Sequence, residues 1–364
     1  GERRVPVTKS TENLDLDLKL RFRRLFFLAG YWTPVEVELS TYDETSRRQL
    51  SRRPLTDLDV LGIKYTENFS RHIVVGDCKS GSGGSEVSRL FWVSGVCKYF
   101  GADEAYLVKT RLDSHIRTVA PKIGVRLLDA DALRQLEDAE GIKGQAEYLL
   151  DSDLWVKTAL PKVPRDDSPR SAALRDLRSY LAYSYWYIEP HRRIFVLIDK
   201  ISHAAEFLRS DDDVSQGLFF ACVERFAHCA VDAAHYVAAQ GFHDIPRNVR
   251  RYLYGGPLAM KEKQALFQLL AEVTSTKQEL DPSWLVNYLE YVNRMVRHRF
   301  GAKDVLRYAS VLYVWRVVLK QDDPVGMAGI DVNHESLVLA KDSARLLISI
   351  CGLQQNMMDP LKNF

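Results

Sequence analysis

Three observations predict an α/β N-terminal domain, with a mixed central sheet flanked by helices, followed by an all-α C-terminal domain. The chain has 364 residues, which exceeds the usual size of one domain. Before residue 140, short β-branched runs alternate with helical stretches, as in a helix-flanked sheet. From residue 170 onward, apolar residues recur with helical spacing. The polar, proline-rich segment Pro161–Pro169 lies between these patterns, so we expect domains at 1–140 and 170–364, with 141–169 as a linker or terminal helix.

The first expected element covers residues 14–28, and its pattern fits two structures. Apolar and charged residues alternate from Leu14 to Phe22 with a period of two, which favours a strand. Leu14, Leu18, Phe22, Leu25 and Leu28 also form one face of a helix. The residue pattern alone leaves both structures open.

The stretches Thr56–Ile63 and His72–Gly81 are predicted as strands, and each carries carboxylates beside an apolar run. Because side chains alternate between the two faces of a strand, Asp77 and Lys79 project from the same side. A hairpin between the two strands would bring Asp59 beside them. The sequence therefore predicts two carboxylates and one amine in one place.

This combination of groups has a chemical logic. Two carboxylates hold a hard divalent cation such as Mg²⁺ or Mn²⁺ and leave positions for water and a phosphate oxygen. The bound metal would polarise the phosphorus centre and help to generate hydroxide. Lys79 is placed to orient or deprotonate that water, or to neutralise the charge that develops on the phosphate.

The order of these features resembles the PD-(D/E)XK nuclease superfamily, and more narrowly the Mrr-like restriction endonucleases, over about residues 10–140. Asp59 matches the metal-binding aspartate of the family, and Asp77-Cys78-Lys79 matches its D-x-K signature. The resemblance implies a restriction-endonuclease-like fold in which Asp59, Asp77 and the backbone carbonyl of Cys78 bind the metal. The other matching segments are a first helix ending at Leu25–Tyr31, a strand at Val35–Leu39, a helix at Ser85–Phe100, and strands at Ala105–Thr110 and Ile123–Asp129.

The match departs from the family pattern at three points. No proline directly precedes Asp57 or Asp59, and the first helix has no clear mid-helix glutamate. The glutamine that often follows the D-x-K strand is also not evident, so the resemblance leaves the positioning of substrate unexplained.

Further candidates surround this motif. Glu38 and Asp57 are possible secondary metal ligands, or surface and hydrogen-bonding residues. Several basic residues are candidates for nucleic-acid binding, since arginine holds phosphates, and Tyr252 and Tyr254 could stack on bases. The candidate nucleic-acid-binding residues are Arg47, Arg48, Arg52, Arg53, Ser80, Arg247, Arg250 and Arg251.

The second half of the chain is predicted to be helical. Ser168 followed by Pro169 predicts the start of its first helix. His228, Asp232 and His235 share one helical face, which fits either metal ligands or buried polar residues satisfied by neighbouring helices. The expected helices are 170–187, 190–209, 214–240, 259–276, 282–299, 302–320 and 334–352.

Composition limits the class of protein. The formal net charge is +2, and residues 1–140 hold 22 basic and 21 acidic side chains, so a nucleic-acid surface must be a local patch. Five cysteines without a C-x-x-C pair predict reduced thiols and a cytoplasmic location. The sequence has no apolar run long enough to span a bilayer and no apolar signal core at its start, so no membrane segment is predicted. The chain begins with Gly1, as expected of a processed product or an expressed fragment.

Together these features predict a magnesium-dependent endodeoxyribonuclease, and the family resemblance implies a role in restriction or antiviral defence, with repair as the second choice. Its partner would be nucleic acid, most simply double-stranded DNA. The helical domain would recognise the target, form a homodimer or receive a signal within a larger complex. One alternative is a nuclease fold that binds nucleic acid or protein without cleaving. Another is a helical ribonuclease that uses Arg294 and His298.

Overall fold

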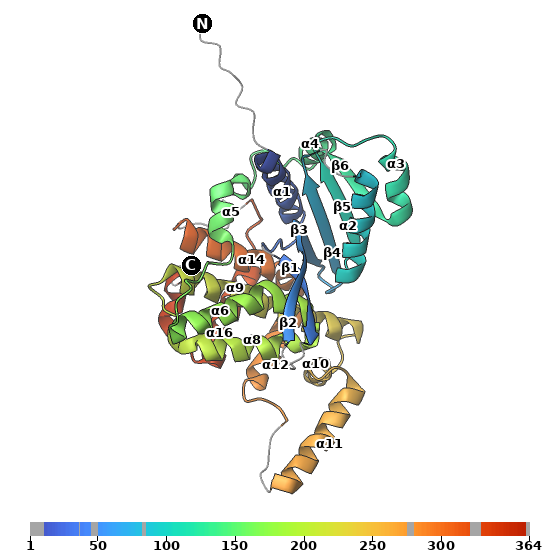
Figure 1. The fold of residues 1–364 in the computed structure, drawn as a ribbon. Helices are drawn as coiled ribbons and strands as arrows, with labels where there is room; N and C mark the ends of the chain where they lie inside the picture. Colours follow the sequence, from blue (N-terminus) through green and yellow to red (C-terminus); the bar gives the residue numbers. More distant parts are fainter. Residues whose placement is uncertain are drawn as a thin grey trace.

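In the computed structural model, the described residues are 11–35, 37–44, 50–81, 85–274, 280–320 and 329–361. They form a mixed four-stranded sheet flanked by helices, a separate two-stranded hairpin and a large helical C-terminal part (Figure 1). The prediction of a mixed α/β sheet region followed by a helical part is therefore confirmed. The strands are β1 (Val37–Glu44), β2 (Leu50–Leu58), β3 (Val60–Tyr65), β4 (Arg71–Lys79), β5 (Glu104–Lys109) and β6 (Val125–Asp129).

The structure resolves the ambiguous first element as a helix. Helix α1 (Thr11–Leu28) packs against β3 and β4, and Leu18, Phe22 and Leu25 are buried between α1 and the sheet. A strand would turn Leu25 to the face opposite Leu18 and Phe22, because side chains alternate along a strand. Burial of one helical stripe therefore outweighs the alternating pattern.

Strand β4 lies at the centre of the sheet, between antiparallel β3 and parallel β5, and β6 extends the parallel part. Val74 and Cys78 point toward α1, while Ile73 and Val75 join the core on the opposite face. At Gly76 a Cβ atom would lie 2.3 Å from Phe22 Cε1, so glycine is required for the close approach of α1. Helix α2 (Glu86–Phe100) covers the opposite face of the sheet, and the side chain of Ser85 caps the N-terminus of this helix.

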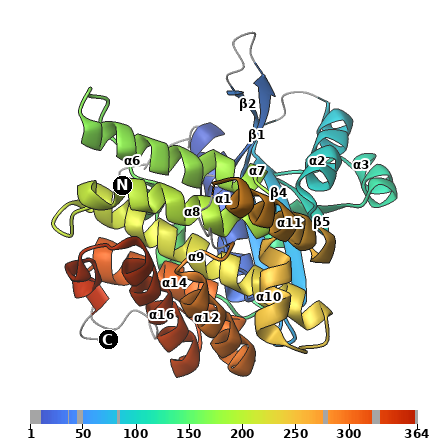
Figure 2. The same cartoon turned by 90° about the horizontal axis from the view of Figure 1, so that it is seen from below.

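The strand expected at 56–63 is divided in two. Strand β2 ends at Leu58, β3 begins at Val60, and Asp59 occupies the bend between them. Strand β2 pairs with β1 in a separate hairpin that extends away from the main sheet (Figures 1 and 2). The strand predicted at residues 35–39 correspondingly begins at Val37 and continues to Glu44.

The C-terminal part is helical throughout its described residues, and the last described strand ends at Asp129. Ser168 caps α6, as predicted, by accepting a hydrogen bond from the Ser171 amide. The sequence did not predict α10, and the helices expected at 170–187 and 302–320 each contain a π-helical segment, at Tyr180–Ser184 and Tyr313–Val318. The helices that follow α2 are α3 (Ile116–Val119), α4 (Ala130–Ala139), α5 (Ser152–Thr158), α6 (Pro169–Ser179), α7 (Tyr185–Tyr187), α8 (Pro190–Ala204), α9 (Asp213–Ala239), α10 (Ile245–Leu253), α11 (Pro257–Thr274), α12 (Leu285–Arg297), α13 (Arg299–Ala302), α14 (Val305–Leu312) and α16 (His334–Cys351). Short 3₁₀ segments lie at Ala120–Ile123, Glu147–Leu150, Ala205–Phe207 and Gln355–Leu361.

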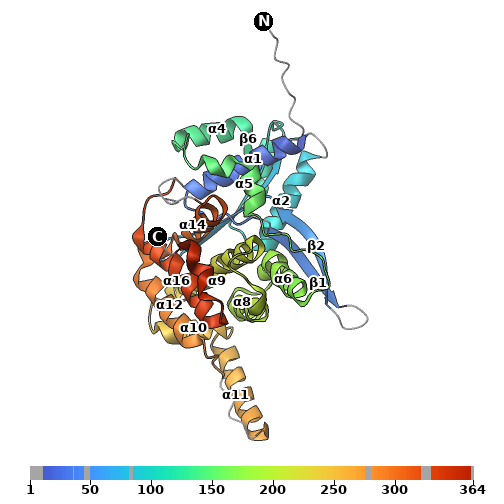
Figure 3. The ribbon, with the colours of Figure 1, turned by 90° about the vertical axis from the view of Figure 1, so that its left-hand side faces the viewer.

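Helix α9 is the central element of the helical part, and α6, α8, α10, α12, α14 and α16 surround it (Figure 3). One continuous apolar core joins this bundle to the α2 face of the sheet. Trp32, which forms an isolated bridge with Ile63, donates a 2.9 Å hydrogen bond to Glu224 on α9. The two predicted regions are therefore in direct contact through buried groups.

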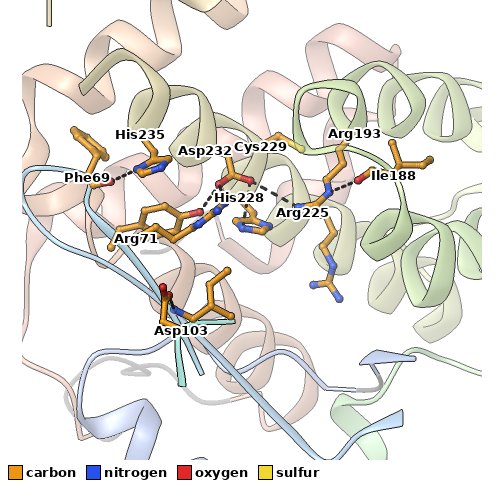
Figure 4. A network of polar contacts seen from close by, with 12 residues as sticks. Phe69, Arg71, Asp103, Ile188, Arg193, Arg225, His228, Cys229, Asp232 and His235 are labelled. Atoms are coloured by element: carbon orange, nitrogen blue, oxygen red, sulfur yellow. Dashed lines mark hydrogen bonds and ion pairs between the residues drawn. The ribbon is translucent and has the colours of Figure 1, made fainter. Parts of the chain in front are cut away.

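A buried polar network strengthens this contact (Figure 4). The carboxylate of Asp232 on α9 accepts hydrogen bonds from Tyr65 on β3 at 2.6 Å and from Arg71 on β4 at 3.1 Å. Arg193 on α8 and His228 lie 3.7 and 3.6 Å from the same carboxylate. Burial acts to raise the pKa of Asp232, but the charges of Arg71 and Arg193 and the hydrogen bond from Tyr65 contribute to lowering it overall.

The metal alternative for this group finds no support in its contacts. Burial lowers the pKa of His228 to about 3, so its ring is neutral, and its Nδ1 bonds the hydroxyl of Tyr185 at 2.8 Å. His235 bonds the backbone carbonyl of Phe69 at 2.6 Å instead of facing Asp232. These contacts fit the alternative of buried polar residues that bond neighbouring elements, although Asp232 Oδ2 accepts no hydrogen bond from the described residues.

Helix α11 projects from the helical part in the views of Figures 1 and 3. Its Leu258, Leu266, Leu269 and Val273 are more than half exposed. No helix among the described residues is long and apolar enough to cross a membrane.

Candidate functional site

The two aspartates of the predicted site lie at the same end of the sheet. Val60 pairs with Gly76 in the antiparallel register, so the bend at Asp59 lies beside Asp77. The Cys78 amide donates a 2.8 Å hydrogen bond to Asp59 Oδ2, which fixes this carboxylate against the end of β4. The strand break at residue 59 thus turns an acidic side chain toward the neighbouring strand.

Asp77 is buried and forms a bidentate ion pair with Arg89 of α2. Arg89 Nε donates to Asp77 Oδ2 at 2.6 Å, and Arg89 Nη2 donates to the other oxygen. Burial raises the pKa of Asp77, although the hydrogen bonds and charge of Arg89 oppose this effect. The guanidinium group also lies 4.2 Å from the ring centre of Trp92.

Helix α1 supplies two more charged groups. Lys19 Nζ lies 2.6 Å from Asp59 Oδ1, and Asp15 Oδ2 lies 3.7 Å from Lys79 Nζ. Asp15 also accepts a hydrogen bond from the Ser80 amide. Sequence reasoning sought a mid-helix glutamate and missed Asp15 and Lys19; their i, i+4 spacing was the available signal.

A cavity of about 480 Å³ lies next to these carboxylates, between the end of β4 and the start of α2. Lys79 and Lys109 occupy paired positions on parallel β4 and β5, and both line the cavity with Arg89 and Trp92. Lys109 is buried and ion-paired with Glu86 at the start of α2. Sequence reasoning did not single out Lys109 or Arg89, because neither lies in the D-x-K motif.

The two possible secondary ligands have different surroundings. Glu38 and Asp57 face each other in the β1–β2 register and line a second cavity of about 290 Å³, together with Asp59 and Lys19. Glu38 is ion-paired with Arg52. Asp57 is exposed, so it remains accessible to a ligand beside Asp59.

The donor set at Asp59 and Asp77 suits a hard cation. Carboxylate oxygens from neighbouring strands can bind Mg²⁺ together with water and a substrate phosphate. Among the described residues no group of three or more acidic, histidine or cysteine side chains is placed to hold a metal ion. Cys78 directs its side chain into the α1 core, and metal binding by its carbonyl stays a prediction.

The basic candidates fall into separate places. Arg47 and Arg48 lie outside the described residues. Arg52 stacks 3.7 Å from the ring centre of Tyr183, and Arg53 pairs with Asp43 at 2.5 Å. Ser80 follows β4 directly, at the end of the strand that carries Lys79.

The patch on α10 differs from its predicted form. Tyr254 is buried and its hydroxyl donates a hydrogen bond to the Leu280 carbonyl, and the Tyr252 ring centre lies 5.4 Å from that of Tyr236. Neither ring is therefore free to stack on bases, contrary to the expectation from the sequence. Tyr254 lies just past the end of α10 and also bonds Asp281, and Tyr252 packs on Tyr236 of α9, so contacts with distant residues direct both rings into the protein. Phe242, just before α10, contacts Phe69 before β4, which places α10 at the far end of β4, about 20 Å from Asp77. The basic residues on α10 are Arg247, which is exposed, Arg250, which pairs with Asp281, and Arg251, which bonds Asn248.

Replacement of Arg89 by alanine is expected to strengthen Mn²⁺ binding about tenfold. The reason is that a divalent cation must displace the bidentate Arg89 pair to reach Asp77, and charge-assisted hydrogen bonds contribute about 1.5–3 kcal/mol. Calorimetric titration of Mn²⁺ into the free protein measures this change. Arg126→Ala, which breaks an exposed ion pair with Glu104, is the matched control and should leave the affinity unchanged. Unchanged or weaker Mn²⁺ binding in Arg89→Ala would contradict the competition.

Comparisons with models of protein families, with curated proteins and with solved structures found no match to this chain. The chemistry of the site is therefore what indicates a function.

Proposed function

We propose that the protein is a metal-dependent nuclease that hydrolyses phosphodiester bonds, most simply a DNA endonuclease in restriction or antiviral defence. The observation that carries this proposal is the convergence of Asp59, Asp77 and Lys79 at one end of a mixed sheet. The sheet has α1 on one face and α2 on the other, so both helices bring charged side chains to the aspartates, which supports the proposal.

Each residue has a role that follows from its position. Asp59 and Asp77 would hold Mg²⁺ or Mn²⁺, and the bound metal supplies Lewis-acid activation of the phosphate and of water. Lys79, whose side chain is partly exposed in the cavity, orients the attacking water or takes its proton. Lys109 and Arg89 provide further positive charge for the substrate phosphates.

Double-stranded DNA is the proposed substrate, and cutting both strands at once would use two active sites in a homodimer. The partly exposed leucines of α11 offer a surface for such contacts. A larger defence complex, in which the helical part binds the partner subunit, is compatible with the same site.

The test is cleavage of supercoiled plasmid, linear DNA and single-stranded RNA with Mg²⁺ or Mn²⁺. Asp77→Asn is expected to abolish metal-dependent cleavage, since it removes the buried charge that binds the metal while keeping the side-chain size. Asp131→Asn, at an exposed aspartate of α4, is the matched control and should cleave like the wild type. Equal cleavage by wild type and Asp77→Asn would place catalysis elsewhere.

A second candidate is a nucleic-acid-binding module that does not cleave. The ion pairs that neutralise both carboxylates, Lys19 with Asp59 and Arg89 with Asp77, favour this candidate. It predicts tight DNA binding without metal and no cleavage by any variant. The helical ribonuclease alternative has less support, because Arg294 forms an ion pair with Asp342 and His298 forms a hydrogen bond with Glu335, both on α16.

A further inference from the structure

Aromatic side chains lie exposed along the outer face of α2. Phe91, Trp92 and Tyr99 are 57%, 36% and 56% exposed, although rings of this size are usually buried. Trp92 and Tyr99 are two helical turns apart, about 10 Å along the axis. Between them lies Gly95, where an added Cβ would meet no atom within 4 Å. This face of α2 is therefore an open strip with an aromatic ring at each end.

The first end of the strip adjoins the candidate catalytic site. Trp92 lines both the basic cavity of Lys79 and the narrow space between Asp59 and Asp77. Arg89 stacks on the Trp92 ring while it holds Asp77. A nucleic-acid strand that places a phosphate at the two aspartates would thus contact the Trp92 side chain directly.

The other end of the strip opens into an aromatic hollow of about 250 Å³. Tyr99, Phe100, Trp186 and Tyr187 line it. Tyr187 is 51% exposed, and its ring lies 4.7 Å from that of Tyr42 on β1. The hollow therefore joins α2, the β1–β2 hairpin and the start of the helical part.

Basic groups accompany the rings at both ends. Lys79, Arg89 and Lys109 lie at the catalytic end. Beside the other end, Arg52 is the cross-strand partner of Tyr42 and is ion-paired with Glu38. The combination of exposed aromatic rings with nearby cations suits a single strand of nucleic acid, because unpaired bases expose their faces for stacking. In a duplex these faces are already stacked on one another.

We infer that the outer face of α2 and the Tyr99–Tyr187 hollow bind unpaired nucleotides of the substrate strand as it leaves the catalytic site. The inference rests on the proposed nuclease function for the identity of the ligand as nucleic acid. The segment of nucleic acid bound there would be single-stranded or a locally opened part of a duplex. Stacking on this strip would also position the substrate. The glutamine that often follows the D-x-K strand in the resembled family is not evident in this sequence, so another group must do this.

The experiment measures fluorescence anisotropy of a dye-labelled single-stranded DNA oligonucleotide and of its duplex, with the full chain in EDTA. Tyr99→Ala and Tyr187→Ala are each expected to weaken single-strand binding roughly tenfold, because each loses a stacking contact. Tyr99→Phe keeps the ring and should bind like the wild type. Phe300→Ala removes an aromatic side chain of α13 that is 58% exposed and serves as the matched control.

Loss confined to single-strand binding, with Tyr99→Phe and Phe300→Ala unaffected, supports the strip. Wild-type affinity in both alanine variants, or an equal loss of duplex binding, overturns it. Because EDTA removes the metal, this result is independent of cleavage. Failure of the nuclease proposal would appear separately, as the absence of metal-dependent cleavage by the wild type, and unaltered cutting by Asp77→Asn would mean that the assigned site is wrong.

Discussion

Lys79→Ala is expected to lower the single-turnover rate of plasmid cleavage by about 10²–10⁴-fold, the usual contribution of one acid–base or water-orienting group. The Lys79 amine lies at the end of β4, two residues after Asp77 and on the same face, beside the basic cavity. Both aspartates remain in place in this variant. We therefore expect Mn²⁺ binding to change far less than the rate.

Lys79→Arg distinguishes the two roles of this amine. Arginine keeps the positive charge but stays protonated, so it can stabilise charge without accepting a proton. Substantial activity in Lys79→Arg would assign charge stabilisation, and loss equal to that of Lys79→Ala would assign proton transfer or a specific geometry. Lys122→Ala, at an exposed lysine outside the cavity, controls for nonspecific loss of charge. Wild-type cleavage by Lys79→Ala would remove the lysine from the mechanism.

Asp232→Ala is expected to destabilise the protein by about 3–5 kcal/mol, the range for breaking one partner of a buried ion pair. The variant leaves the nearly buried guanidinium of Arg193 without its countercharge. It also removes the hydrogen-bond acceptors of Tyr65 and Arg71, which belong to the sheet. The lost interactions therefore weaken both the contact between the sheet and the helical bundle and the packing of α9 itself.

Denaturant unfolding followed by tryptophan fluorescence and by far-ultraviolet circular dichroism measures this effect. Asp176→Ala breaks an exposed ion pair with Lys200 and should cost less than about 1 kcal/mol. Tyr65→Phe, which removes one hydrogen bond from the network, should cost roughly 1–3 kcal/mol. If Asp232→Ala were no less stable than Asp176→Ala, the network would not be a principal contact between the two regions.

Local sequence patterns predicted most elements correctly. Ser168 and Pro169 marked the start of α6, and alternation along β4 placed Asp77 and Lys79 on one face. These predictions succeed because capping and side-chain direction depend on residues close together in the chain. The missed helix α10 and the division of the strand at Asp59 depend on contacts with distant elements, α9 and β1.

Residue patterns along the chain were enough to expect two acids and an amine at the end of a strand pair, followed by a helical region. The packing of the folded chain added Asp15 and Lys19 from α1, Arg89 from α2 and Lys109 from β5 to that place. It also decided that α1 is a helix and joined Tyr65 to Asp232 across 167 positions of sequence. The physical reason is that periodicity defines which face of an element is buried, whereas packing of whole elements determines which faces meet.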